Sequence, residues 1–264
     1  MHLATENPLI EACAKFGVSR DTRDWKPLDG GRSNRCWLVK SEAPLVVKHY
    51  NRANASKLFA NNAELEWISL TALAPRGLAP LPMHRSSLPD GSDIILYAYV
   101  SPLGEVGATE IGTFLRNLHD QPPPMGLPDH KGFERILELC KHYKLECGLP
   151  DYRPKRAVLL HGDPVTPNIL MSDRVLAIDW QCPALGDPCY DIAIALSSGM
   201  RVAYGYPPFS DLERTKFWCA YRDDDVKSQF DKVGPVYRQI IAAYLNARAN
   251  TLDEKAARAE LEQE

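Results

Sequence analysis

Short apolar runs separated by polar or glycine-containing turns dominate the first hundred residues. Runs of this length, bounded by turn residues, are typical of β-strands. Five strands are predicted in this way, at residues 25–28, 36–39, 45–50, 83–85 and 94–100. Two helices accompany them: one ends at Gly17, and one is expected from a cap at Ser56 to Leu73, before the helix-stopping sequence 74–77.

After residue 100 the spacing of apolar residues becomes that of helices. Helices are expected at residues 109–118, 133–145, 188–196, 212–221 and 234–248, and the charged tail 253–264 is expected to be a surface helix or frayed. The change divides the chain into an N-terminal lobe, residues 1–100, and a C-terminal lobe, residues 101–264. The predicted fold class is α+β, with a small antiparallel sheet followed by a mainly helical lobe.

A polar motif interrupts the helical lobe at residues 161–168. Pro164 and Pro167 prevent a continuous helix, because proline lacks the backbone donor, so Asp163 is expected on a loop. Residues 168–171 and 175–179 then read as the two strands of a hairpin. If Met171 pairs with Val175, Asn168 lies opposite Ile178, and Asp179 is its neighbour at the open end of the hairpin.

The oxygen atoms of Asn168 and Asp179 are suited to Mg²⁺, which takes one or two protein carboxylates and fills its octahedron with phosphate and water oxygens. Asp163 remains for another task. A carboxylate one loop away from a metal is placed to orient a hydroxyl group and accept its proton. Each residue alone could be a turn or cap residue, and only their combination indicates a phosphoryl-transfer site.

Lys48 lies within an apolar strand and shares a face with Val46 and Tyr50. A lysine there either guards a sheet edge or has an acidic partner. Glu66 lies on the apolar stripe of the next helix, so it is the expected partner, and Glu64 is the alternative. Such an ion pair holds the lysine against nucleotide phosphates in kinase-fold enzymes.

The turn formed by residues 30–34 connects the first two strands. Gly30 and Gly31 allow a close approach of the backbone to phosphate, and Ser33 and Asn34 can donate to its oxygens. Two glycines between strands are more commonly just a tight connection. Neither a Walker loop nor a Rossmann glycine motif is found in the sequence, so those nucleotide-binding folds are not indicated.

The composition is that of an ordinary globular protein. The chain has 264 residues and a net charge of -3, which argues against a nucleic-acid partner. It lacks an apolar stretch long enough for a membrane span and a recognisable signal peptide, so a cytoplasmic location without a membrane partner is expected. The seven cysteines lack a C-x-x-C pair, and we expect reduced thiols and no zinc site.

Taken together, the motif 161–168, the sequence Ile178-Asp179-Trp180 and the Gly-Gly-x-Ser-Asn turn resemble the aminoglycoside phosphotransferase and choline kinase-like family. The resemblance covers most of the chain and implies a two-lobed protein-kinase-like fold with ATP and Mg²⁺ as cofactors. It implies that Asp163 is the catalytic aspartate and that Asn168 and Asp179 hold the metal. Relatives usually carry an aliphatic residue at Pro164 and many carry an acid at Gln181.

The resemblance also suggests structural roles around the motif. Asp187 is expected to cap the helix that begins at Pro188, and Asp191 to reach the loop at His161. His161 is expected to fix the loop by hydrogen bonds rather than to carry a proton. Asp163 is therefore the only predicted catalytic base.

The acceptor is less well defined by the sequence. Several aromatic residues of the C-terminal lobe could hold a cationic alcohol such as choline, ethanolamine or thiamine by cation-π attraction, or could simply be core residues. They are Trp180, Phe217, Trp218, Tyr221, Tyr237 and Tyr244. The acidic run 223–225 could attract a polycationic aminoglycoside, or be a solvated loop. The leading hypothesis is a kinase of a small cationic metabolite; the alternatives are an aminoglycoside phosphotransferase and a nucleotide-binding pseudokinase.

Overall fold

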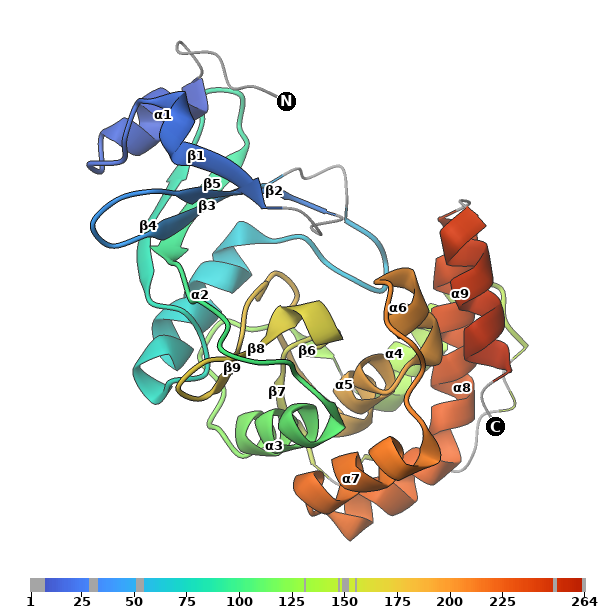
Figure 1. The fold of residues 1–264 in the computed structure, drawn as a ribbon. Coiled ribbons are helices and arrows are strands. Elements are labelled where there is room, and N and C mark those ends of the chain that lie inside the picture. The colour runs from blue at the N-terminus through green and yellow to red at the C-terminus, as the bar shows by residue number, and fades with distance from the viewer. Residues whose placement is uncertain are drawn as a thin grey trace.

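The N-terminal lobe is built on one antiparallel sheet (Figure 1). A computed structural model of the chain describes residues 8–28, 33–50, 55–130, 132–146, 148, 152–154, 156–248 and 251–262. The strand order is β1-β2-β3-β5-β4. The bounds are β1 Trp25–Leu28, β2 Arg35–Val39, β3 Leu45–His49, β4 Pro82–Ser87 and β5 Asp93–Ala98. The five strands predicted from the sequence are therefore confirmed.

Alternation along the strands separates two apolar layers. Val47 and Leu96 belong to a cluster with helix α1, Pro8–Ala14, whereas Val46 and Tyr50 belong to the main core with helix α2, Ala63–Leu73. Figure 1 shows α1 and α2 on opposite sides of the sheet. Because side chains alternate along a strand, Lys48 points to the α2 side, toward the C-terminal lobe.

The start of α2 differs from the prediction. Ser56 does not cap this helix: its Oγ accepts a hydrogen bond from Phe59 N in a local turn. The cap is Asn62, whose Oδ1 accepts from Glu64 N and Leu65 N, at 2.9 and 3.1 Å. Serine and asparagine side chains can both accept hydrogen bonds from the first backbone amides of a helix. Ser56 and Asn62 are therefore both possible caps of α2, and the sequence pattern alone does not distinguish them.

The C-terminal lobe consists of helices around short strands. Its helices are α3 Ala108–His119, α4 Gly132–His142, α5 Pro188–Ala195, α6 Ser198–Ala203, α7 Asp211–Tyr221, α8 Asp224–Ala247 and α9 Thr251–Leu261. A small sheet joins β6 Asp129–His130, β10 Ala184–Gly186 and β7 Val158–Leu160, and β8 Ile169–Met171 pairs with β9 Val175–Ala177. The sequence pattern predicts neither α6 nor the small sheet, because a helix of six residues and strands of two or three residues are too short to show a period.

Helix α8 begins ten residues earlier than predicted and continues through Pro235. The acidic run is its start rather than a solvated loop: Asp223 caps the helix, accepting from Val226 N at 3.0 Å. Asp223 Oδ2 also accepts from Arg116 and Arg156, at 2.9 and 3.1 Å. Acidic residues are favourable at a helix N-terminus, and these contacts leave no free acidic patch at Asp223.

The tail is more than a surface helix. Helix α9 packs against α6 and α8, and one of its faces is buried. Glu260 accepts hydrogen bonds from Ser197 Oγ and Gly199 N, at 2.5 and 2.7 Å, at the first turn of α6. The charged composition of this segment concealed its role in holding α6 in place.

The described part of the chain contains no helix that is long and apolar enough to cross a membrane. Its six cysteines are free thiols, and Cys147 lies outside the described residues.

Candidate active site

A sharp loop after β7 carries the polar motif. Gly162 has a φ of 86°, and a Cβ atom there would lie 1.9 Å from the carbonyl oxygen of Cys182. Both the backbone conformation and the close approach require glycine. The loop is therefore pressed against the segment that follows Asp179, which brings the two halves of the predicted motif together.

Asp191 anchors this loop from α5. Its Oδ2 accepts from His161 N at 2.8 Å and its Oδ1 accepts from Gly162 N at 2.9 Å. His119 Nε2 lies 3.3 Å from Oδ2, and the Asp191 side chain is fully buried. Asp187 caps α5 by accepting from Cys189 N at 3.0 Å. The roles predicted for Asp187 and Asp191 are confirmed.

His161 is part of the same scaffold. Its Nε2 lies 3.0 Å from the carbonyl oxygen of Ile178, and its Nδ1 accepts from Asp163 N at 3.2 Å. These contacts define a neutral imidazole that donates from Nε2 and accepts at Nδ1. Burial lowers the pKa of His161, which also favours the neutral ring. The histidine thus links the loop to the strand that leads to Asp179, as predicted.

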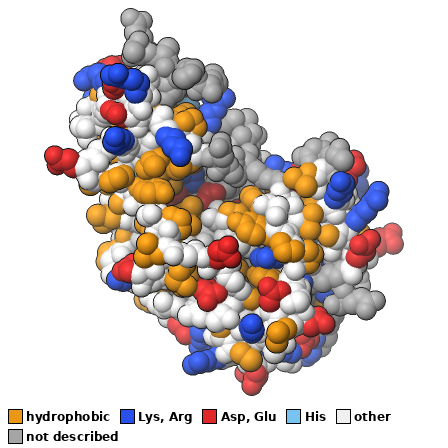
Figure 2. All heavy atoms as spheres, viewed as in Figure 1, with side chains coloured by type: hydrophobic (Ala, Val, Ile, Leu, Met, Phe, Trp, Pro, Cys, Tyr) orange, Lys and Arg blue, Asp and Glu red, His pale blue; other side chains and the backbone are white. Residues whose placement is uncertain are grey.

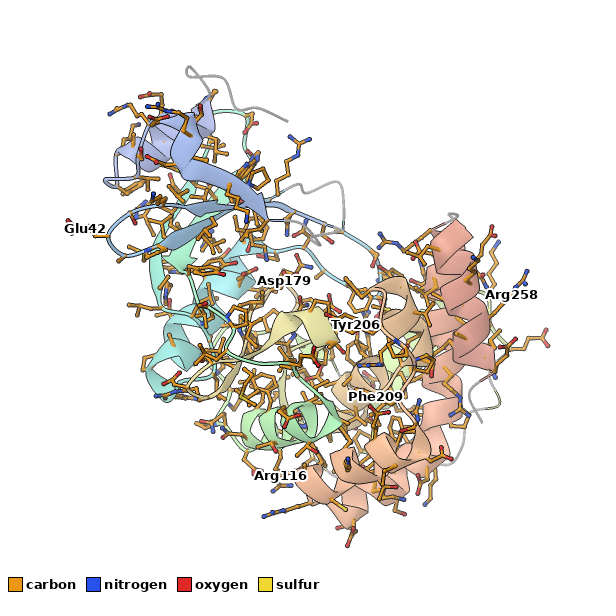
Figure 3. The ribbon with its side chains drawn as sticks, in the orientation of Figure 1. Glu42, Arg116, Asp179, Tyr206, Phe209 and Arg258 are labelled. Carbon is orange, nitrogen blue, oxygen red and sulfur yellow. The ribbon has the colours of Figure 1, made fainter. Side chains whose placement is uncertain are left out.

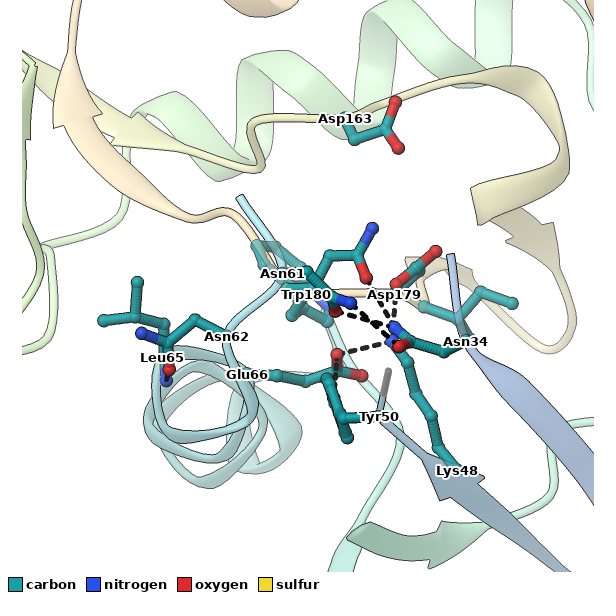
Figure 4. A network of polar contacts seen from close by, with 12 residues as sticks. Asn34, Lys48, Tyr50, Asn61, Asn62, Leu65, Glu66, Asp163, Asp179 and Trp180 are labelled. Carbon is teal, nitrogen blue, oxygen red and sulfur yellow. Dashed lines mark hydrogen bonds and ion pairs between the residues drawn. The ribbon is translucent and has the colours of Figure 1, made fainter. Parts of the chain in front are cut away.

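The carboxylate of Asp163 is buried without a hydrogen-bond donor. Its Oδ1 is sealed from solvent and has no hydrogen-bond partner among the described residues, and Figure 4 draws no contact to this side chain. Burial, reinforced by Asp179 and Asp191, raises the pKa of Asp163 well above its ordinary value. A carboxyl group held in this way costs stability and is ready for a proton or a hydroxyl group.

The hairpin has the predicted register. Met171 pairs with Val175, and Ile178 N donates to Asn168 O at 2.9 Å. Asn168 Nδ2 donates to Asp163 O at 2.9 Å, so its Oδ1 is turned away from that contact. Asp179 follows with a φ of 64°, a left-handed conformation that is uncommon outside glycine and that aspartate tolerates better than most residues.

Lys48 connects the two lobes. Its Nζ lies 2.6 Å from Glu66 Oε2 and 2.5 Å from Asp179 Oδ1 (Figure 4). Tyr50 OH also donates to Glu66 Oε2. Burial alone would lower the pKa of Lys48, but Asp179 and Glu66 raise it above its ordinary value, so the ammonium group stays charged. Glu66, not Glu64, is the partner.

Two oxygen atoms are available for a cation. Asp179 uses only Oδ1 for Lys48, and Asn168 Oδ1 accepts no hydrogen bond from a described residue. Both are hard ligands of the kind that Mg²⁺ prefers. No group of three or more His, Cys, Asp or Glu side chains with metal-binding geometry is found in the described ranges, so a metal here would need oxygens from a bound phosphate as well.

The glycine-containing turn is described only in part. Gly30 and Gly31 lie outside the described residues. Asn34 Nδ2 donates to Gln181 Oε1 at 2.7 Å and to Asn61 Oδ1 at 2.9 Å. Gln181 thus ties the end of the turn to the segment after β9 that carries Asp179. The sequence does not predict this contact, because Gln181 stands out there only as a position at which many relatives carry an acidic residue.

The aromatic residues singled out in the C-terminal lobe do not line an acceptor cage. Five of them are buried in the core and only Trp218 is partly exposed. Trp180 packs on His161 with ring centroids 4.4 Å apart, and Phe217 stacks on Tyr221. These five residues are therefore core residues and not a cation-π site for the acceptor. Aromatic residues at helical spacing can form either, so the spacing alone does not distinguish them.

Residues 24–229, more than half of the chain, match the model of the phosphotransferase enzyme family. The fold is similar to that of a choline/ethanolamine kinase family protein from Mesorhizobium loti, with 15% identity, 96% of this chain and 92% of that chain covered, and a TM-score of 0.66. It is also similar to aminoglycoside 2'-phosphotransferase-IIIa in complex with GDP, with 15% identity, coverages of 96% and 94%, and a TM-score of 0.65.

A third similar structure is amicoumacin kinase hAmiN in complex with AMP-PNP, Ca²⁺ and Ami, with 14% identity, coverages of 90% and 87%, and a TM-score of 0.64. Because the sequence identities are so low, these structural similarities show the fold alone. No curated protein matches the chain by sequence.

Burial of the Asp163 carboxylate without a hydrogen-bond donor should lower the free energy of unfolding of the protein. The raised pKa means that folded Asp163 binds its proton more tightly than the unfolded chain does, so unfolding free energy is lost as pH rises between the two pKa values. We expect nucleotide-free Asp163→Asn to be more stable than the wild type at pH 8, by about 1 kcal/mol. This advantage should shrink as the pH falls toward about 4, the ordinary pKa of aspartate. Urea unfolding between pH 4 and 8 measures it, and an advantage that grows on acidification would contradict the assignment.

Proposed function

Because this chain belongs to the phosphotransferase enzyme family, we propose that it transfers the γ-phosphoryl group of ATP to a hydroxyl group of a small molecule, with Mg²⁺. The observation that carries the proposal is the convergence of Asp163, Asn168 and Asp179: Asn168 Nδ2 donates to Asp163 O, and Asp179 binds Lys48 (Figure 4). The N-terminal lobe, residues 1–100, would bind the nucleotide, and residues 101–264 would provide the catalytic groups and bind the acceptor.

The nucleotide half of the proposal rests on Lys48. Its ammonium group stays charged between Glu66 and Asp179, and in kinases the equivalent ion pair positions a lysine against phosphate oxygens. Similar structures contain AMP-PNP or GDP, which supports a nucleoside triphosphate as donor. Gly30, Gly31, Ser33 and Asn34 would lie over its phosphates. Asn34 would then exchange its contact with Gln181 for a phosphate oxygen.

Asn168 Oδ1 and Asp179 are the proposed metal-holding groups. The metal, when bound, neutralises charge that develops on the transferring phosphate oxygens. Asp179 now neutralises Lys48, so a cation at Asp179 would release the lysine toward phosphate. One carboxylate and one amide oxygen leave most of an octahedron for phosphate and water oxygens, as is usual for Mg²⁺.

Asp163 is the proposed catalytic base. The acceptor oxygen would form a bond to the γ-phosphorus as the bond from that phosphorus to the β-bridging oxygen breaks, and ADP leaves with the electron pair. The acceptor's hydroxyl proton would pass to the unpartnered Asp163 carboxylate. His161 and Asp191 hold the loop in place but face away from this transfer, since their polar atoms are used by the backbone.

The acceptor is proposed only as a small hydroxyl compound. A cationic alcohol was favoured by the aromatic residues of the C-terminal lobe, and most of these are core residues. An aminoglycoside was favoured by the acidic run 223–225, where Asp223 is already bound to arginine. The intact Lys48, Asp163, Asn168 and Asp179 set argues against a pseudokinase.

ADP release in the presence of ATP and Mg²⁺ across choline, ethanolamine, thiamine, sugars and aminoglycosides tests the function directly. We expect at least one acceptor to raise the rate to about 1 to 100 per second. Asp163→Ala should lower this rate by about 10² to 10⁴ with ATP affinity nearly unchanged, because a general base contributes about that factor. The Asp163→Asn variant serves as the blank. Near-full activity in either variant would refute the role of Asp163.

Removal of Asp179 should have a different signature. We expect Asp179→Ala to lose the metal-dependent part of ATP binding, because a chelating carboxylate is gone. Titration of AMP-PNP with Mg²⁺ and with EDTA measures this, and Asp173→Ala, on the exposed turn of the same hairpin, is the matched control. If Mg²⁺ strengthens AMP-PNP binding equally in the wild type and in Asp179→Ala, Asp179 is not a metal ligand.

A further inference from the structure

A buried arginine lies beside the catalytic loop. Arg201, on α6, is only 8% exposed. Its Nη1 donates to Thr166 Oγ1 at 2.8 Å and its Nε donates to Pro207 O at 2.6 Å. The guanidinium group also lies 3.6 Å from the centroid of the Phe209 ring. These contacts fix its plane between the catalytic loop and the segment after α6.

The charge of Arg201 has no partner of opposite sign. Among the described residues it forms no ion pair, and Glu213, which acts on it at a distance, is bound to Ser210. A buried charge is costly unless it is paired. Its Nη2 makes no hydrogen bond to a described residue, and it is not among the polar atoms sealed from solvent. One edge of the guanidinium group can therefore reach a molecule in the adjoining space.

The catalytic aspartate is on the same loop as Thr166. The recess that Arg201 lines with Val165, Thr166 and Tyr206 is itself too small for a ligand, so a ligand would meet the free edge from the solvent side. Thr166 is three residues from Asp163, and three peptide units span at most about 11 Å. Tyr206 is 39% exposed, and Figure 3 shows it beside α6 across from Asp179. Figure 2 shows a hollow between the lobes on this face, with hydrophobic side chains on both sides of it.

We propose that the free edge of Arg201 binds an anionic group of the acceptor, a carboxylate or a phosphate, while the acceptor's hydroxyl group lies at Asp163. The planar guanidinium fork matches such oxyanions and is the usual residue for them. The inference rests on the proposed phosphotransferase activity and narrows its acceptor: polycationic acceptors are disfavoured.

Matched acceptor pairs provide the test. ADP release is measured with glycerate against glycerol, gluconate against sorbitol, and serine against ethanolamine, where only the anionic group differs. Glycerol 3-phosphate against glycerol tests phosphate in place of carboxylate. We expect the anionic member of at least one pair to have a kcat/KM at least about 10-fold higher, the effect of one charge-assisted contact.

Arg201→Gln should abolish this preference, measured as the ratio of kcat/KM between the two members of each pair, mainly by raising KM for the anionic member. Arg201→Lys should retain part of the preference, because it keeps the positive charge. If Arg201 only supported the loop, this variant would not retain the preference. Arg214→Gln is the matched control: Arg214 is also partly buried, and it bonds to Leu196 O and Ser198 Oγ rather than to the catalytic loop. It should keep the preference.

Several results would overturn the inference. One is a wild-type enzyme that turns over both members of each pair equally or prefers choline or kanamycin. Another is an Arg201→Gln variant that lowers both members of each pair alike. If no compound raises ADP release above the rate without acceptor, the proposed function fails instead. The anion site is then judged by binding: glycerate, but not glycerol, should raise the melting temperature of the protein with Mg²⁺ and ADP, and Arg201→Gln should remove this shift. Equal shifts would refute the site.

If Arg201→Gln does not fold, Arg201→Lys is measured in its place, and an unchanged preference in that variant would count against the inference.

Discussion

The site depends on one carboxylate that holds two successive backbone amides. Asp191 accepts from His161 N and Gly162 N, and its side chain is completely buried. This contact fixes the loop on α5, and α5 is itself set by its cap, Asp187. A carboxylate with two backbone donors is a strong, directional contact in a low-dielectric interior. The positions of Asp163 and, through the hairpin, of Asp179 follow from it.

The two lobes share one apolar core, and an ion pair is added to it. Lys48 bridges Glu66 on α2 and Asp179 behind the hairpin. The same groups are those that a nucleotide and a cation would engage. Among the described residues, Asp163 Oδ1 has no hydrogen-bond donor, and neither has Glu66 Oε1. The protein therefore keeps unsatisfied carboxylate oxygens where chemistry would occur, which is typical of functional sites.

The sequence predicted the parts whose signals are local. Pro164 and Pro167 indicated the loop, the turn 172–174 indicated the hairpin and its register, and the helical stripe favoured Glu66, with Glu64 as the alternative. The features that the sequence did not predict depend on tertiary contacts. The buried face of α9, the link between Asn34 and Gln181, and the contact between Arg201 and Thr166 arise between segments far apart in the chain. No pattern of neighbouring residues encodes them, and charge made the α9 segment look solvent-exposed.

Hydrogen exchange at the amides of His161 and Gly162 is the most direct test of the central contact. Because both donate to a buried carboxylate, we expect them to exchange far more slowly than exposed loop amides, and their protection to fall sharply in Asp191→Ala while β3 amides stay protected. Residue-resolved exchange by NMR measures both. Exchange of these two amides at rates near those of unstructured peptide, or protection that Asp191→Ala leaves unchanged, would contradict the account.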